Sequence, residues 1–217
     1  MTSTEDMRRE RTPGPEAGPR AAESGPSIAD PGPLGLAAFA LTTFVLSLFN
    51  AEIAPESLEP VVLPLALFYG GVAQFLAGMW EFRKGNTFGA TAFGSYGAFW
   101  VAFAAYVQVI EPKLLASGST ESEVKVATGL FLIGWALFTL YMFVASLRTN
   151  AGLISVFLTL FLTFALLAVA DLLGASGLAV VGGIVGIVSA LCAWYTSAAI
   201  VTNETWGRTV MPVGPRS

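Results

Sequence analysis

The stretch Asp30–Asn50, DPGPLGLAAFALTTFVLSLFN, decides how the rest of the chain is interpreted. Its two prolines cannot lie inside a helix, but they fit the first turn of one, where backbone N–H groups have no partner within the helix. An apolar run follows that carries only three hydroxyl side chains, those of Thr42, Thr43 and Ser47. The stretch therefore predicts a short membrane-spanning helix whose polar N-terminus can receive an anion without any basic residue.

The composition of the whole chain is typical of a membrane protein. Of its 217 residues, 54% are hydrophobic and only 12% are charged, whereas about a quarter of the residues of a soluble domain are charged. Long apolar runs recur along the chain with short breaks between them. We therefore predict an all-α integral membrane protein with six transmembrane helices, at Leu34–Asn50, Val61–Trp80, Thr91–Val109, Val124–Leu147, Ala151–Leu173 and Leu178–Thr202.

The two ends of the chain differ in composition from this apolar region. Residues 1–29 are rich in Pro, Gly, Ala, Glu and Arg and have no apolar core, which predicts a disordered tail. No apolar segment follows the arginines within this tail, so we do not expect a cleaved signal peptide there. The predicted organisation is an N-terminal tail at 1–29, a six-helix transmembrane domain at 30–202 and a C-terminal tail at 203–217.

The distribution of basic residues predicts the orientation in the membrane. Nine of the 11 lysines and arginines lie in the two tails, in the loop between the second and third spans, and in the turn between the fourth and fifth. The other side has only Lys113 and Lys125, and its first loop carries Glu52, Glu56 and Glu59. The positive-inside rule therefore places both termini in the cytoplasm, and an even number of spans also requires them to share one side. We expect a multi-pass protein of the plasma membrane.

Small and aromatic residues predict how the helices pack. Gly182 and Gly186 have GxxxG spacing, which Ala190 continues, and such a face lets helices approach closely in lipid. Aromatic anchoring at the membrane interface is the expected role of the tryptophans, because most of them lie near the predicted span ends or on one face. They are Trp80, Trp100, Trp135, Trp194 and Trp206.

Several classes of chemistry are excluded by residues that the chain lacks. It contains no histidine, so a Ser–His pair is absent, and no segment carries paired carboxylates or a GxxxxGK[ST] loop. The single cysteine, Cys192, excludes an intrachain disulfide and, without histidine, makes a zinc, haem or iron–sulfur site unexpected. We predict that the protein is not an enzyme and has no cofactor, no metal site and no nucleic-acid partner.

The polar residues within the spans predict a pore. An amide at the middle of an apolar helix is costly without a partner, so Gln74 either lines a pore or bonds another helix. Glu81 and Asp171 lie near span ends, where each is either a proton relay or a charged group in the headgroup region; the second is favoured for Asp171, and both stay open for Glu81. Apart from Lys125, the second residue of the fourth span, no lysine or arginine lies inside the predicted spans. Such a path suits a small, weakly bound solute rather than a tightly held polyanion.

Several motifs, in order, resemble the acetate uptake transporter family, also called the succinate–acetate permease family. The family signature Asn-Pro-x-Pro-Leu-Gly-Leu is similar to Asp30-Pro31-Gly32-Pro33-Leu34-Gly35-Leu36. The similarity continues at Phe68-Tyr69-Gly70-Gly71 with Gln74, Gly85-Asn86-Thr87-Phe88-Gly89, Ser95-Tyr96-Gly97, Asn203-Glu204, and Gly207-Arg208-Thr209 ahead of Pro212. The resemblance covers the chain from Asp30 to Gly214.

This resemblance implies a six-helix protomer that has its own pore and assembles into a homohexamer. It implies transport of acetate and, in some members, succinate or other small carboxylates, with proton symport and channel-like permeation both open. The pore constriction that it implies matches Phe39, Tyr96 and, without a sharp motif to fix the register, Leu160. An alanine linked to substrate range matches Ala193, also without a motif to fix the register.

Further residues are expected to line the substrate path. They are Asp30, Thr42, Thr43, Tyr69, Gln74 and Asn86, together with Ala193, and Glu81 is the candidate proton relay. Asp30 departs from the family, which has Asn there. Either Asp30 caps the helix, since Asp and Asn cap about equally well, or its charge alters entry of a carboxylate; the cap is favoured.

Two other functions remain open at this point. The first is a channel for ammonia or another small neutral solute, against which the absence of histidine pairs argues. The second is a membrane protein that transports nothing and serves a signalling or assembly partner. Neither tail contains a recognisable soluble domain, which disfavours this second function.

Overall fold

The computed structural model describes residues 28–214, so nearly all of the predicted tail at 1–29 lies outside the described part. The helices in chain order are α1 (Gly32–Asn50), η1 (Glu56–Val61), α2 (Val62–Pro64), η2 (Leu65–Ala73), α3 (Gln74–Lys84), α4 (Thr87–Ala105), η3 (Tyr106–Ile110), α5 (Glu111–Ala116), α6 (Glu121–Ser146), α7 (Ala151–Leu173) and α8 (Ser176–Trp206). Residues 28–214 contain no strand. The predicted all-α class is confirmed.

Six stretches are long and apolar enough to cross a membrane, as predicted. They are Gly32–Asn50, Glu56–Lys84, Thr87–Ala116, Glu121–Ser146, Ala151–Leu173 and Ser176–Trp206. The second of them joins η1, α2, the π-helix η2 and α3, and the third joins α4, the π-helix η3 and α5. Each long stretch therefore forms one span of the bundle.

The predicted bounds of three spans were too short. The second span begins at Glu56 and ends at Lys84, the third covers Thr87–Ala116, and α8 continues to Trp206. An apolar window stops at the first charged or polar residue, but a helix continues until its backbone hydrogen bonding is interrupted. The first four residues of the predicted tail at 203–217 therefore complete α8, which ends where Gly207 takes a left-handed conformation with φ 62°.

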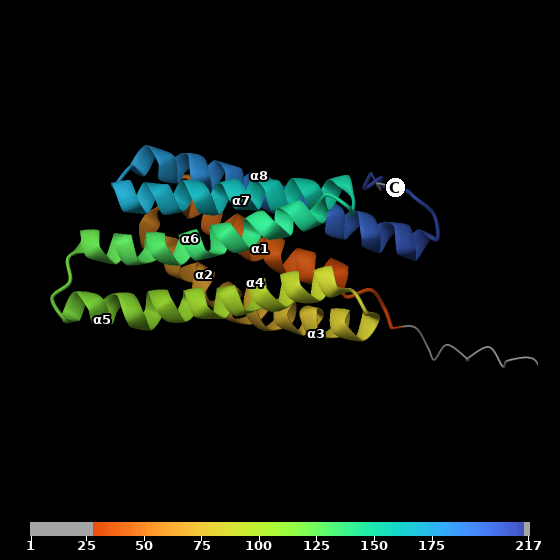
Figure 1. The fold of residues 1–217 in the computed structure, drawn as a ribbon, viewed down its shortest axis with the longest axis horizontal. Coiled ribbons are helices and arrows are strands. Elements are labelled where there is room, and N and C mark those ends of the chain that lie inside the picture. Colours follow the sequence, from red (N-terminus) through yellow and green to blue (C-terminus); the bar gives the residue numbers. More distant parts are fainter. Residues whose placement is uncertain (1–27, 215–217) are drawn as a thin grey trace, which may run out of the picture.

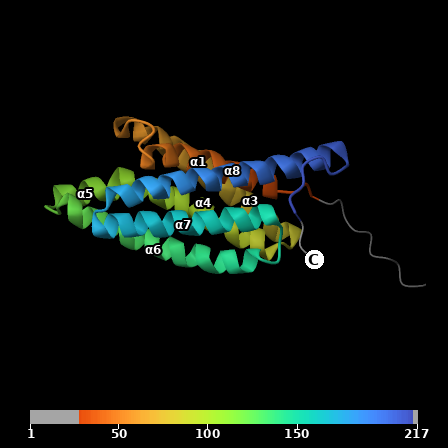
Figure 2. The same ribbon diagram turned by 90° about the horizontal axis from the view of Figure 1, so that it is seen from above.

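The spans run along a common axis and form an elongated bundle (Figures 1 and 2). α1 packs against α8, α8 against α7, α7 against α6, and α3 against α4. α1 begins and α8 ends at the same end of the bundle, which we call the N/C end (Figure 1). The other end, which holds α5 and the first turns of α6 and α8, is called the opposite end. That the N/C end is cytoplasmic remains a prediction from the basic residues.

Small residues let α8 approach its neighbours, as its GxxxG spacing predicts. A Cβ atom added at Gly186 would collide with the Ser47 hydroxyl on α1, and one at Gly182 would lie 2.9 Å from a Leu167 methyl on α7. Gly183 lies against the backbone where α1 ends, next to Ala51. The glycines of α8 therefore face two helices and hold α1 and α7 close to the same segment.

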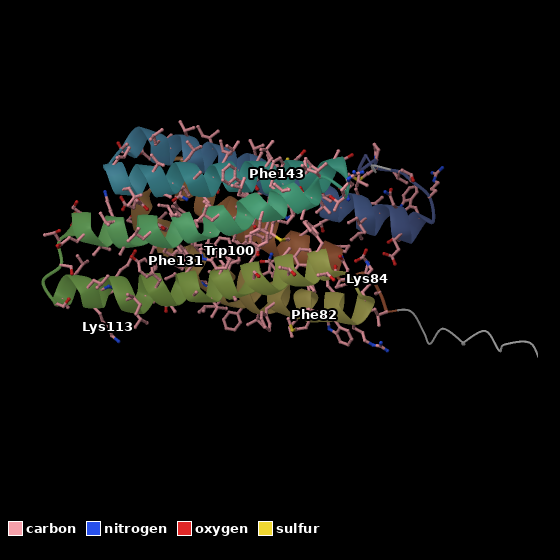
Figure 3. All side chains as sticks on the ribbon, in the orientation of Figure 1. Phe82, Lys84, Trp100, Lys113, Phe131 and Phe143 are labelled. Carbon is pink, nitrogen blue, oxygen red and sulfur yellow. The ribbon has the colours of Figure 1, made fainter. Side chains whose placement is uncertain are left out.

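The expectation that tryptophans anchor the protein at the membrane interface is wrong for Trp100, and Trp135 is half-buried. Trp100 is 2% exposed and meets Phe99 and Phe103 edge-on, with ring centroids 5.1 and 6.0 Å away. Trp135 likewise packs against Phe99 at 5.0 Å. Figure 3 shows Trp100 and Phe131 midway along the bundle, and the Trp100 ring lies against Gly70 of η2. The position of a tryptophan along a predicted span does not show whether its ring faces the lipid or the interior of the bundle, so the sequence could not predict this burial.

The residues after α8 fold back onto the start of α7. Asn203 accepts the N–H groups of Val210 and Met211 and donates to the Met211 carbonyl at 2.8 Å. The first N–H groups of α7, those of Ala151 and Gly152, donate to the carbonyls of Gly214 and Val213. The C-terminal segment therefore satisfies donors that the first turn of a helix leaves open.

We expect Gly183→Ala to destabilise the bundle, because the added methyl group meets main-chain atoms near Ala51 that cannot rotate away. Overpacking of this kind costs about 1–3 kcal/mol. The thermal unfolding midpoint of the purified protein in detergent measures the effect. Gly134→Ala is the matched control, since nothing lies within 4 Å of a Cβ atom there. Equal midpoints for the two variants would contradict this account of the α1–α8 contact.

Candidate functional site

Two cavities enter the bundle from its two ends. The N/C cavity, of about 200 Å³, is lined at its mouth by Asp30, Lys84 and Asn150. The opposite cavity, of about 660 Å³, is lined at its mouth by residues that include Glu56 and Asp171. Their lining residues come from the start of one set of helices and the end of another, so together the cavities extend along most of the bundle.

Three side chains line both cavities: Phe39 of α1, Tyr96 of α4 and Leu160 of α7. Each is at most 4% exposed. The ring centroids of Phe39 and Tyr96 are 6.1 Å apart, and the planes are tilted by 51°. Three separate helices thus bring these side chains into one apolar layer between the cavities.

The hydroxyl group of Tyr96 is held within this layer. It lies 2.9 Å from the Thr139 hydroxyl, which donates its own hydrogen to the Trp135 carbonyl at 2.7 Å. Thr139 can therefore only accept from Tyr96, so the Tyr96 O–H is the donor of that bond. Edge-on contact with Phe138, at 5.3 Å, further fixes the ring. The Tyr96 side chain is ordered by its partners and presents its ring to both cavities.

Buried polar groups line the N/C cavity. Glu81, 1% exposed, accepts a hydrogen bond from the Asn86 amide at 2.8 Å. The Asn86 side-chain oxygen in turn accepts the Gly89 N–H at 3.1 Å and caps α4. Gln74 is equally buried and lines the same cavity, and its amide oxygen has no hydrogen-bond partner among the described residues. Of the two roles left open for Gln74, the geometry supports the cavity-lining one.

Three helix N-termini at the N/C cavity favour an anion. Helices α1, α4 and α7 all begin beside it, and their first turns contribute Gly32, Gly89 and Leu153 to its lining. The N-terminal end of a helix carries a partial positive charge and unpaired N–H groups. Asn150 caps α7 by accepting the Leu153 N–H at 2.9 Å. This cavity therefore collects three positive helix ends.

A basic residue also lines this cavity, contrary to the expectation of an entry without one. The Lys84 ammonium lies 2.8 Å from an oxygen of Asp30, and the same oxygen accepts the Gly32 N–H at 2.9 Å. Figure 3 shows Lys84 at the N/C end of the bundle. Lys84 lies four residues beyond the predicted second span, and only the longer helix places it at the cavity. Asp30 thus bonds the first turn of α1 while its charge is balanced by a lysine.

The opposite cavity has the other electrostatic character. Its lining includes five carboxylates and only one lysine, Lys125; the carboxylates are those of Glu56, Glu59, Glu111, Glu121 and Asp171. Within residues 28–214, no group of three or more acidic or cysteine side chains lies close enough together to hold a metal ion. Deeper in the cavity lie the hydroxyls of Thr43, Ser47 and Thr163. The opposite cavity is therefore strongly acidic, whereas the charged side chains of the N/C cavity are only Asp30, Glu81 and Lys84.

Three residues expected in the substrate path line neither cavity. Thr42 is fully buried, donates to the Ala38 carbonyl at 3.0 Å, and packs where α1 meets Gly70. Tyr69 lies on the π-helix η2, and Ala193 is buried within α8. The cavities therefore do not support a place for these three residues in the substrate path. A residue in a family motif can serve helix packing instead of lining a pore. Sequence inspection missed Lys84 and Asn150, although Asn150 has the residue type of a helix cap.

The Glu81–Asn86 contact can be tested by exchanging its polar groups. Asn86→Asp keeps an oxygen to cap α4 but replaces the donor by a second carboxylate facing Glu81. We expect a lower thermal unfolding midpoint, from a loss of about 1–3 kcal/mol. Adding Glu81→Gln returns an amide donor on the other partner and should recover part of the loss. A double variant no more stable than Asn86→Asp would contradict the contact.

Comparison with known proteins places these features in a family. The chain is 42% identical over 178 residues to Ammonia transport outward protein 2 of Saccharomyces cerevisiae, and covers 63% of that protein's length. It is 40% identical over 187 residues to the succinate-acetate/proton symporter SatP of Escherichia coli, and the aligned region covers 86% of this chain and 96% of SatP.

A solved structure and a family model agree with these sequence matches. The structure of the bacterial acetate channel SatP superposes with a TM-score of 0.78 at 40% identity, covering 87% of this chain and all of that one. A family model matches residues 14–215. The chain therefore belongs to the GPR1/FUN34/yaaH family.

Proposed function

We propose that this protein carries acetate and related short carboxylates, such as succinate, across a membrane. The observation that carries the proposal is the pair of cavities that enter from opposite ends and share only the layer of Phe39, Tyr96 and Leu160. The substrate class comes from the SatP relatives, which are named as a succinate-acetate/proton symporter and an acetate channel. In this proposal the three shared side chains form the pore constriction that the family resemblance implies.

The N/C cavity has suitable partners for a carboxylate. Lys84, the amide groups of Gln74 and Asn86, and three helix N-termini offer positive charge and hydrogen-bond donors. The opposite cavity adds the hydroxyls of Thr43 and Ser47 on the other side of the constriction. Acetate is small enough to exchange one set of partners for the other across a single layer of side chains.

The constriction also explains why protons belong to the proposal. An ionised carboxylate that leaves polar partners for an apolar layer pays a large desolvation cost, which protonation reduces. Glu81 is the candidate relay, because it is a buried carboxylate in the lining of the N/C cavity and one of its oxygens already accepts the Asn86 amide. In proton symport such a relay can deliver the proton to the substrate, whereas channel-like permeation of the anion has no use for one.

The setting of the protein completes the proposal. The six spans make it a multi-pass membrane protein. We place it in the plasma membrane with the N/C end in the cytoplasm, on the distribution of basic residues. Self-association into a homohexamer, each protomer with its own pore, follows the family resemblance.

A channel for ammonia is the second candidate, because one relative is named for ammonia transport. The chain offers no histidine to such a path, and its N/C mouth collects positive helix ends that suit an anion. Stopped-flow measurement of ammonia permeability in the same vesicles separates the two functions.

Uptake of labelled acetate into proteoliposomes tests the main proposal. We expect protein-dependent uptake at acidic outside pH, and unlabelled acetate should reduce it. In a competition series, formate, lactate and succinate should reduce it to different degrees. Uptake that falls as the outside pH rises at constant acetate concentration indicates proton coupling or entry of the acid. Uptake equal to that of protein-free vesicles would overturn the function.

Phe39→Ala tests the constriction. Removing the ring widens the layer between the cavities, so we expect the ratio of acetate to succinate uptake to fall. Phe44→Ala is the matched control on the same helix, because Phe44 packs against Trp194 at 5.2 Å and lines neither cavity. The constriction is misplaced if the ratio stays constant in Phe39→Ala, or if both variants change it equally.

A further inference from the structure

An ion pair between two side chains of the cavity wall occupies the N/C mouth. Asp30 and Lys84 both line the N/C cavity, and the ammonium nitrogen lies 2.8 Å from Asp30 Oδ1. Their side chains are 29% and 37% exposed, so the pair is reached by solvent from the mouth. Any carboxylate that enters from this end therefore meets a lysine that already holds a carboxylate.

The Asp30 side chain has the chemistry of the proposed substrate. A methylene group that carries a carboxylate is acetate attached to the chain. Its Oδ1 accepts both the Lys84 ammonium and the Gly32 N–H at the start of α1, at 2.8 and 2.9 Å. These are the charge-assisted donor and helix N-terminal donor that a free carboxylate needs. Asp30 thus takes up two of the partners that this mouth offers to a substrate, the only lysine of its lining among them.

Polar side chains continue along the cavity wall from the ion pair toward the middle of the bundle. The carboxylate of Glu81, one turn before Lys84 on α3, is engaged by the Asn86 amide, so it leaves Lys84 to Asp30. Deeper in the same cavity is the buried Gln74 amide, whose oxygen has no partner among the described residues. Lys84 is therefore the cationic partner at the mouth of a path that continues to the Gln74 amide, whose oxygen has no partner among the described residues.

We propose that Lys84 binds the substrate carboxylate at the N/C mouth and that Asp30 competes with it as a tethered carboxylate, which lowers the affinity of this mouth. This inference rests on the proposed function. Asp30 acts here as a specificity-determining residue, since a substrate must displace it to reach the lysine. The departure from the family's Asn is then a change in binding strength and not a change of helix cap.

Equilibrium exchange of labelled acetate in proteoliposomes tests the proposal, with equal acetate concentrations inside and outside so that the orientation of the protein does not matter. Asp30→Asn removes the charge and keeps an oxygen for the Gly32 N–H. We expect the half-saturating acetate concentration to fall about two- to fivefold, as for loss of a partly exposed ion pair. Lys84→Met, and Lys84→Gln as a second variant, should raise it.

The double variant Asp30→Asn/Lys84→Met decides between competition and simple charge repulsion. Competition requires the lysine, so the double variant should match Lys84→Met alone. A further fall of the same size in the Lys84→Met background would overturn the proposal, because Asp30 would then act only by repelling the anion. An unchanged or raised value in Asp30→Asn alone would overturn it too.

Two controls distinguish a specific role of Lys84 from a general charge effect, and failure of this inference from failure of the proposed function. Arg83→Met removes an equal charge next to Lys84 from an exposed side chain that lines neither cavity, and should leave the half-saturating concentration unchanged. A fall or rise equal to that of the Lys84 variants would overturn a specific role for Lys84. Absence of exchange in the wild type would overturn the proposed function and this inference together, whereas exchange without the predicted shifts overturns this inference alone. Thermal unfolding midpoints confirm that each variant is folded.

Discussion

The close approach of α1 to its neighbours is the constraint on which the rest of the structure depends. In lipid, helices gain nothing from hiding apolar surface, so they associate where small residues let backbones meet. Gly186 admits Ser47, Gly183 admits the end of α1, and the buried Ser197 hydroxyl donates to the Pro33 carbonyl at 2.7 Å. α8 thereby holds α1 along its length, with Phe39 on the face that meets Tyr96.

The direction of the helices then determines the charge at each end of the bundle. Because the chain alternates in direction, α1, α4 and α7 all begin at the N/C end, and their positive ends surround one cavity. The carboxylates at the other mouth lie in the short helix η1 and in the first or last turns of α5, α6 and α7, among them Glu59 and Asp171. The three positive helix ends at one mouth are thus a consequence of topology, and the excess of carboxylates at the other comes from a few charged residues near the helix ends.

Much of the fold was predictable because it depends on local pattern. Apolar runs of sufficient length predicted all six spans, and the glycine spacing on α8 predicted its packing face. The errors occurred where a helix outlasts its apolar run. Lys84 was missed for this reason, whereas Asn150 was missed although it caps a span whose start was predicted correctly. Trp100 was assigned to the membrane interface although it is buried in the aromatic core. Local hydrophobicity records neither helix continuation nor which face turns inward.

The sequence by itself determined a six-span membrane protein without histidine, with basic residues gathered on one side and family motifs in order. Those properties depend on composition, run length and spacing, which need no partner segment. The family resemblance had grouped Phe39, Tyr96 and Leu160, but only the tertiary structure showed that they line two cavities from opposite ends. It alone showed that Thr42 and Ala193 are buried and line neither cavity, and that Asp30 meets a lysine. These relations join residues from separate helices, and their distances depend on how the helices pack.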